Sequence, residues 1–286
     1  MSNRTVLEVI PARPTSDGDG VKISRVIGNR GMKDLDPFLL LDEIKSDESK
    51  DYIGGFPPHP HRGFETITYM RNGSFRHRDH LGNDGVINSG GAQWMTAGSG
   101  VIHSEMPEQE EGSLHGFQVW LNLPAKDKMQ KASYRNIQRE LIPEVSTENG
   151  VVINVLAGNL TIGNNTYQGP IHGQATQPVY WDLNIPQKET LTVPLDERFN
   201  GYLYLYSGTI SIENREVSAQ SFIRLSEGCD ITITANTDAR LLLLAGIPIG
   251  EPIANHGPFV MNNVEEIRQA MRDYEEGTLT DEEHVA

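Results

Sequence analysis

Short apolar runs separated by polar turn residues make up most of the chain. Runs rich in Val, Ile, Leu, Thr, Tyr and Phe alternate with Gly, Asn, Asp and Pro, which is typical of strands joined by tight turns. We expect strands at 38–44, 64–70, 74–79, 93–96, 101–105, 116–123, 151–157, 202–206, 209–213, 222–225, 231–235 and 241–245. Because these runs do not alternate with helical patterns, the sequence predicts an all-β protein of sandwich or barrel type.

One segment has helical periodicity. Apolar residues recur at the spacing of one helix face, namely Val264, Ile267, Met271 and Tyr274. Asn263 is a favourable N-cap residue, and Glu265 and Glu266 suit the positive end of a helix dipole. We therefore expect a short C-terminal helix over 263–275.

A similar pattern occurs in both halves of the chain. In 66–79 an apolar run enters an Asn-Gly turn and returns, and in 202–214 another enters a Ser-Gly turn and returns. This predicts the same kind of hairpin in each half. A polar connecting stretch lies between them, so we expect two related β domains, 1–138 and 139–286.

Charge and composition exclude several classes of protein. The formal net charge of −15 disfavours direct nucleic-acid binding, which depends on clustered Lys and Arg. The single cysteine, Cys229, cannot form an internal disulfide, and 1–10 lacks the pattern of a secretory signal. No apolar run reaches the ~18–20 residues that span a bilayer. We expect a soluble cytoplasmic protein with no membrane partner.

Histidines concentrate in the first half. Within Pro58-His-Pro-His-Arg62, His59 and His61 are two residues apart, so an extended chain places both imidazoles on one face. His103 and Glu105 repeat this spacing farther along the chain. A single His-x-His in a Pro-rich loop is more often solvated than metal-binding, but two such pairs on neighbouring strands of a β fold predict a metal site.

Other titratable groups leave alternatives open. Glu65 shares the parity of His59 and His61, so it competes with Glu105 as the carboxylate ligand. His77 and His80 lie among Arg and Asp residues and are interpreted as a polar outer face. His115 lies on an apolar strand face, where it either lines a cavity or is a satisfied core histidine, and we favour the second.

The donor set indicates the kind of metal. Imidazole and carboxylate ligands suit Fe(II), and also Ni, Cu, Mn or Co, and the absence of thiolate ligands argues against a structural Cys-type zinc site. Such a set leaves coordination positions free for an anionic substrate oxygen. Free positions on a redox-capable ion indicate oxygen chemistry.

Four segments carry a family resemblance. Residues 56–66, 93–107, 116–124 and 256–262 resemble signature segments of the pirin family, within the cupin superfamily. The resemblance implies a bicupin, with two antiparallel, jelly-roll-like β-barrels. It makes 1–138 a metal-binding cupin domain and 139–286 a degenerate one with a terminal helix, which agrees with the absence of His-x-His from the second half.

The resemblance also implies a ligand set. Carried over by motif, the ligands of one divalent ion are His59, His61, His103 and Glu105, and Glu65 lies outside the set. This departs from the general cupin pattern, in which a Glu after the first His pair commonly ligates. The ion would be Fe(II), with Ni, Cu, Mn, Co or Zn as alternatives.

Family members include enzymes similar to quercetin 2,3-dioxygenases, which open a flavonol ring with O2 and release carbon monoxide. On that hypothesis Glu105 is catalytic and accepts the flavonol 3-hydroxyl proton. The expected pocket residues are Phe56, Phe64, Trp94, Phe117 and His115. The alternative is a redox-sensing regulator that binds a protein partner without turnover, and a third option is a metal that only stabilises the fold.

Overall fold

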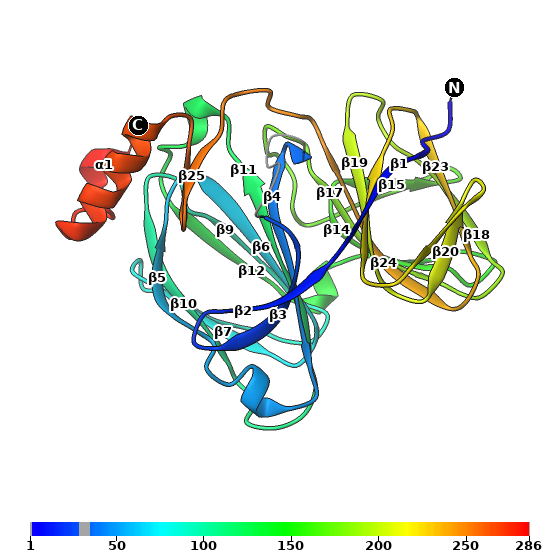
Figure 1. The fold of residues 1–286 in the computed structure, drawn as a ribbon, viewed down its shortest axis with the longest axis horizontal. Helices are drawn as coiled ribbons and strands as arrows, with labels where there is room; N and C mark the ends of the chain where they lie inside the picture. Colours follow the sequence, from blue (N-terminus) through cyan, green and yellow to red (C-terminus); the bar gives the residue numbers. More distant parts are fainter. Residues whose placement is uncertain (1, 29–34, 286) are drawn as a thin grey trace. The chain divides into compact units, whose positions relative to one another are not determined.

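Strands and turns make up most of the chain. The computed structural model describes residues 2–28 and 35–285. Helix α1 (Val264–Glu275) begins where expected, because the Asn263 side chain accepts a hydrogen bond from the backbone N–H of Glu266 at 3.0 Å. The all-β class and the C-terminal helix are confirmed (Figure 1). Within the described ranges, no helix has the length and apolar character that a bilayer crossing requires.

The chain divides into two compact units, and each contains two separate stretches of the chain. One unit combines 13–139 with 249–286, and the other combines 1–12 with 140–248. The N-terminal segment belongs to the second of these units because β1 pairs with β22. The C-terminal segment belongs to the first because Phe259 forms a β-bridge with Arg62 and Asp273 of α1 forms an ion pair with the same arginine. The contiguous domains 1–138 and 139–286 stay a prediction.

In the unit of 13–139 and 249–286, the larger sheet has the strand order β12 (Ser133–Ile137), β9 (Ala92–Thr96), β6 (Phe64–Asn72), β11 (Leu114–Asn122), β4 (Phe38–Ser46), β3 (Val21–Ile27) and β2 (Arg13–Asp17). The smaller sheet has the order β5 (Phe56–His61), β10 (Val101–Pro107), β7 (Phe75–Asp79) and β8 (Asp84–Ile87). A ribbon of β25 (Ala254–His256) and β26 (Phe259–Met261) lies beside α1 (Figure 1).

The unit of 1–12 and 140–248 is built in the same way. Its larger sheet has the order β1 (Val6–Pro11), β22 (Ser221–Leu225), β19 (Asn200–Ser207), β24 (Ala239–Gly246), β17 (Val179–Ile185), β14 (Val152–Ala157) and β13 (Glu144–Ser146). The smaller sheet has the order β18 (Thr190–Pro194), β23 (Asp230–Ala235), β20 (Thr209–Ile212) and β21 (Arg215–Ser218), and β15 (Asn159–Ile162) pairs with β16 (Asn165–Gln168). Short 3-10 helices occur at Ser49–Asp51, Ala125–Asp127, Arg139–Leu141 and Glu282–His284.

The predicted hairpins are wrong, although the same connection does recur. Strands β6 and β7 are consecutive in the chain but belong to different sheets, and the same holds for β19 and β20. Gly73 and Gly208, with φ of +84° and +85°, allow the sharp turn in each case. The chain crosses between sheets there because each strand packs its apolar face onto the shared core from the opposite side.

The two interiors differ in polarity. In the unit of 140–248, both sheets contribute to one apolar cluster that includes Leu203, Leu241 and Ile231, all fully buried. In the unit of 13–139, the interior also holds buried polar groups, among them His61 and His103. Burying polar groups costs free energy unless they are paired or bind a ligand, so this interior is the better candidate for a ligand-binding site. The strand orders in the described residues are those of open sheets, so closed barrels stay a prediction.

Candidate metal centre

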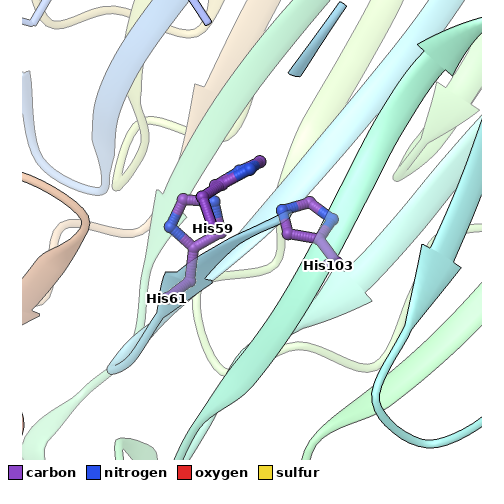
Figure 2. A group of neighbouring side chains, drawn as sticks. All are labelled: His59, His61 and His103. Atoms are coloured by element: carbon purple, nitrogen blue, oxygen red, sulfur yellow. The ribbon is translucent and has the colours of Figure 1, made fainter. Parts of the chain in front are cut away.

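Strands β5 and β10 bring three histidines together. They pair antiparallel, with His59 directly opposite His103 and His61 opposite Val101. Because side chains alternate along a strand, His59 and His61 point to the same side as His103 (Figure 2). One ring nitrogen from each lies within 4.8 Å of the other two. The structure thus assembles the three predicted imidazoles.

Backbone carbonyls select the tautomer of two of these histidines. Nδ1 of His59 lies 2.8 Å from the carbonyl oxygen of Pro57, and Nδ1 of His61 lies 3.3 Å from that of Pro258. A carbonyl oxygen only accepts, so each Nδ1 carries the proton and donates it. The lone pair is therefore on Nε2, where a metal ion can be bound.

His103 provides the test of whether this set fits a metal. Its Nε2 is buried and has no hydrogen-bond partner among the residues that the structure describes. Burial lowers the pKa of His61 and of His103 well below the ordinary value of 6.5, so both rings are neutral near pH 7. Neutral imidazoles converging around an unpartnered nitrogen fit a divalent metal ion.

The two candidate carboxylates occupy different surroundings. Glu105 Oε1 accepts a hydrogen bond from the Thr68 hydroxyl at 2.8 Å, and Glu65 Oε1 accepts one from Thr96 at 2.8 Å. Burial raises the pKa of each carboxyl to about 7. Glu105 forms a second potential ligand group with His103 and His77, within 4.8 Å of one another. Its role as the fourth ligand beside His59 and His61 stays a prediction.

A cavity opens beside the histidines. It has a volume of about 740 Å³, and its wall includes His59, His61, Glu105, Phe56 and Trp120. Ligand cavities commonly measure about 300–1,000 Å³, with aromatic walls and a few polar groups. The cavity therefore has the size and lining to admit an aromatic small molecule to the histidine cluster.

The other expected pocket residues lie elsewhere. Phe64, Trp94, Phe117 and His115 are absent from the wall that the described residues form around this cavity. Phe64 and Phe117 are fully buried in the core. His115 Nε2 donates to a carboxylate oxygen of Glu43 at 2.8 Å, as a satisfied histidine would. A role for these residues toward substrate stays a prediction.

Comparison with known proteins identifies the family. A family model described as Pirin matches residues 20–121, and one described as Pirin C-terminal cupin domain matches residues 180–280. A Pseudomonas aeruginosa protein, provisionally named a quercetin 2,3-dioxygenase, is 47% identical over 96% of this chain and 98% of its own. The chain belongs to the pirin family. Its fold is accordingly the two-part cupin arrangement of that family.

Solved structures agree with this membership. A quercetin 2,3-dioxygenase from Acinetobacter baumannii is 30% identical, with a TM-score of 0.89 over 97% of this chain and 99% of its own. A bacterial pirin from Escherichia coli, solved in complex with nickel(II), is 17% identical with a TM-score of 0.63, over 84% of this chain and 98% of its own. The second likeness concerns the fold alone.

In this member of the pirin family, the placement predicted for His77 is wrong. Its side chain is fully buried and its ring stacks on Tyr134, with ring centroids 4.3 Å apart. Arg76 and Arg78 do face outward, where both pair with Asp84. The sequence signal that indicates a buried His77 is the alternation along β7, since buried Phe75 has the same parity as His77.

Proposed function

We propose that this chain is a metal-dependent dioxygenase that acts on flavonols such as quercetin, opening the ring with O2 and releasing carbon monoxide. The observation that supports it is the cluster of His59, His61 and His103 beside a cavity of about 740 Å³. The relatives that carry quercetin dioxygenase names support the same reaction.

The metal centre would be held by four residues of this chain. His59, His61 and His103 would ligate through nitrogen, with Glu105 as the fourth ligand, and Fe(II) is the ion that we propose first. A divalent redox-capable ion supplies Lewis acidity toward a substrate oxygen and one-electron chemistry with O2. Nickel is a comparison ion, because a related pirin was solved with nickel(II).

Residues of the cavity wall would bind and orient the substrate. The rings of Phe56 and Trp120 offer flat apolar surfaces to a planar flavonol. Glu105 would accept the proton of the 3-hydroxyl group, so the substrate O–H bond breaks and the proton moves to a carboxylate oxygen. Thr68 holds that carboxylate from one side, and its hydroxyl oxygen also lies 2.6 Å from the side-chain amide of Gln118.

The test is product formation by reconstituted protein. Protein loaded anaerobically with Fe(II) is mixed with quercetin and O2, and carbon monoxide is measured together with loss of the flavonol. We expect carbon monoxide to rise in proportion to quercetin consumed. If none appears with Fe, Ni, Cu, Mn, Co or Zn, the proposed activity is wrong.

A matched pair of variants tests the carboxylate. Glu105→Gln should abolish turnover while leaving part of the metal bound, because the amide cannot accept the hydroxyl proton. Glu65→Gln changes a second buried carboxyl of similar pKa that lies in neither ligand group, and it should retain activity. The reverse result would assign the role to Glu65.

A further inference from the structure

A buried polar chain lies next to His103. His77 Nδ1 is 3.3 Å from Nδ1 of His103, and His77 Nε2 is 3.1 Å from Oδ2 of Asp79. The amide nitrogen of Gln93 lies 2.7 Å from the same His77 Nδ1. His77, Asp79 and Gln93 are not among the described residues that line the cavity, so they are not placed to touch a substrate there.

Asp79 can only accept in this arrangement. Its Oδ1 receives the backbone N–H groups of Leu81 at 2.9 Å and Asn83 at 3.1 Å, and its Oδ2 receives the side-chain amide of Asn83 at 2.8 Å. A carboxylate surrounded by donors is an acceptor toward every neighbour. The Nε2 of His77 therefore carries a proton and donates it to Asp79.

The proton positions then follow along the chain. A neutral imidazole has one N–H, so Nδ1 of His77 holds a single lone pair, which accepts from the Gln93 amide at 2.7 Å and is shared with His103 Nδ1 at 3.3 Å. His103 must consequently carry its proton on Nδ1. That leaves the lone pair on His103 Nε2, the buried nitrogen that has no partner among the described residues.

We propose that Asp79 and His77 are positioning residues that set the tautomer of His103, so that its Nε2 is free to bind the metal ion. For His59 and His61 a backbone carbonyl accepts the Nδ1 proton, whereas for His103 the side chain of His77 does so and is itself oriented by Asp79. The inference deepens the proposed function and rests on its metal centre, but it does not require flavonol turnover.

Asp79→Asn is the sharpest test, because the turn dictates how the new amide lies. The backbone N–H groups of Leu81 and Asn83 retain an oxygen at the Oδ1 position, so the amide nitrogen faces His77. Nε2 of His77 must then accept and its Nδ1 must carry the proton, with the Gln93 amide turned so that its oxygen faces that N–H. Nδ1 of His103 then has no acceptor at His77, so its proton is expected to move to Nε2. His103 Nε2 would become protonated and unable to ligate.

The readouts are tautomer and metal affinity. Nitrogen-15 NMR of the full chain before metal addition reports which nitrogen of His103 is protonated, and a Co(II) titration followed by visible absorption reports affinity and ligand field. The matched control is Asp84→Asn, the same chemical change at an exposed residue that pairs with Arg76 and Arg78. Carbon monoxide production is scored separately.

We expect wild-type His103 to be protonated on Nδ1, and Asp79→Asn to move that proton and to weaken Co(II) binding about 10- to 100-fold with a changed spectrum. Asp84→Asn should bind Co(II) as the wild type does. If Asp79→Asn does not fold, His77→Phe keeps the ring on Tyr134, removes both nitrogens and should weaken Co(II) binding to the same extent.

Three results would overturn the inference. The first is a wild-type His103 that is protonated on Nε2. The second is a Co(II) affinity of Asp79→Asn, or of a folded His77→Phe, that equals the Co(II) affinity of Asp84→Asn. The third is a wild type that takes up no Co(II). The last would also remove the metal centre itself. A wild type that binds Co(II) with the expected tautomer but releases no carbon monoxide when loaded with Fe(II) would reject the oxygenase activity and support the role of Asp79 and His77 in setting the tautomer of His103.

Discussion

Arg62 and Asp273 form a buried ion pair, with Arg62 Nη1 2.5 Å from Asp273 Oδ2 and the two side chains 2% and 4% exposed. Arg62 directly follows His61, and Asp273 lies on α1. The same guanidinium also donates to the carbonyl oxygens of Ser99 and Leu279. The C-terminal helix is therefore connected, through one side chain, to the strand end that carries His61 of the proposed metal centre.

Asp273→Asn should destabilise the protein. It leaves the charge of Arg62 buried without its counterion, and breaking such a pair costs about 3 kcal/mol of the free energy of unfolding. Urea unfolding of the metal-free chain measures this loss. The control is Glu265→Gln on the same helix, which removes exposed pairs with Arg268 and Arg272 and should change stability little. Equal effects of the two variants would contradict the prediction.

His61→Ala should abolish metal retention. It removes one of three converging nitrogens, so the loss of affinity should exceed the roughly 10- to 100-fold typical of losing a hydrogen-bond partner of a metal-binding group. Elemental analysis after dialysis and calorimetric titration with Fe(II) provide the measurement. His172→Ala, at an exposed histidine in the other compact unit, is the matched control. Wild-type metal content in His61→Ala would show that the cluster is not the metal site.

The pH dependence of stability should show the raised pKa of the buried Glu65 carboxyl. Burial raises the pKa of its carboxyl from 4.5 to about 7. The folded protein then keeps a proton that the unfolded chain loses, so this stabilisation is fully present below about pH 4.5 and is lost as the pH rises through about 7. Relative to Glu65→Gln, the wild type should lose about 2–3 kcal/mol of unfolding free energy between about pH 5 and about pH 8. If the free energies of unfolding of the wild type and of Glu65→Gln change equally with pH over this window, the carboxyl of Glu65 is not buried as described.

Alanine substitutions of two phenylalanines should distinguish a residue that lines the cavity from a residue of the core. Phe56 lines the cavity and is partly buried, whereas Phe117 is fully buried. Phe117→Ala should cost about 3–5 kcal/mol of stability, because it leaves a hole in the core. Phe56→Ala should cost less and should mainly raise the KM for quercetin. Denaturant unfolding and steady-state kinetics on both variants decide this, and an unchanged KM in Phe56→Ala would place the substrate elsewhere.

Local patterns predicted the strands that alternate clearly and the helix that has a cap. They missed β5, because Pro58 and Pro60 interrupt its pattern; proline is tolerated there since β5 is an edge strand of its sheet. They also missed β17, whose apolar run is broken by Asp182. That carboxylate is buried and accepts a hydrogen bond from the Tyr206 hydroxyl at 2.6 Å, a partner distant in sequence.

The sequence by itself determined which side chains could share a face, because parity along an extended chain is a local property: His59 with His61, and His103 with Glu105. Only the tertiary structure decided which faces meet. Pairing of β5 with β10 placed His59 opposite His103, and pairing of β7 with β10 placed buried His77 opposite Glu105. Strand pairing depends on packing across the whole core. The local parity with Phe75 could indicate that His77 lies inside, but no local pattern could reveal that it contacts His103.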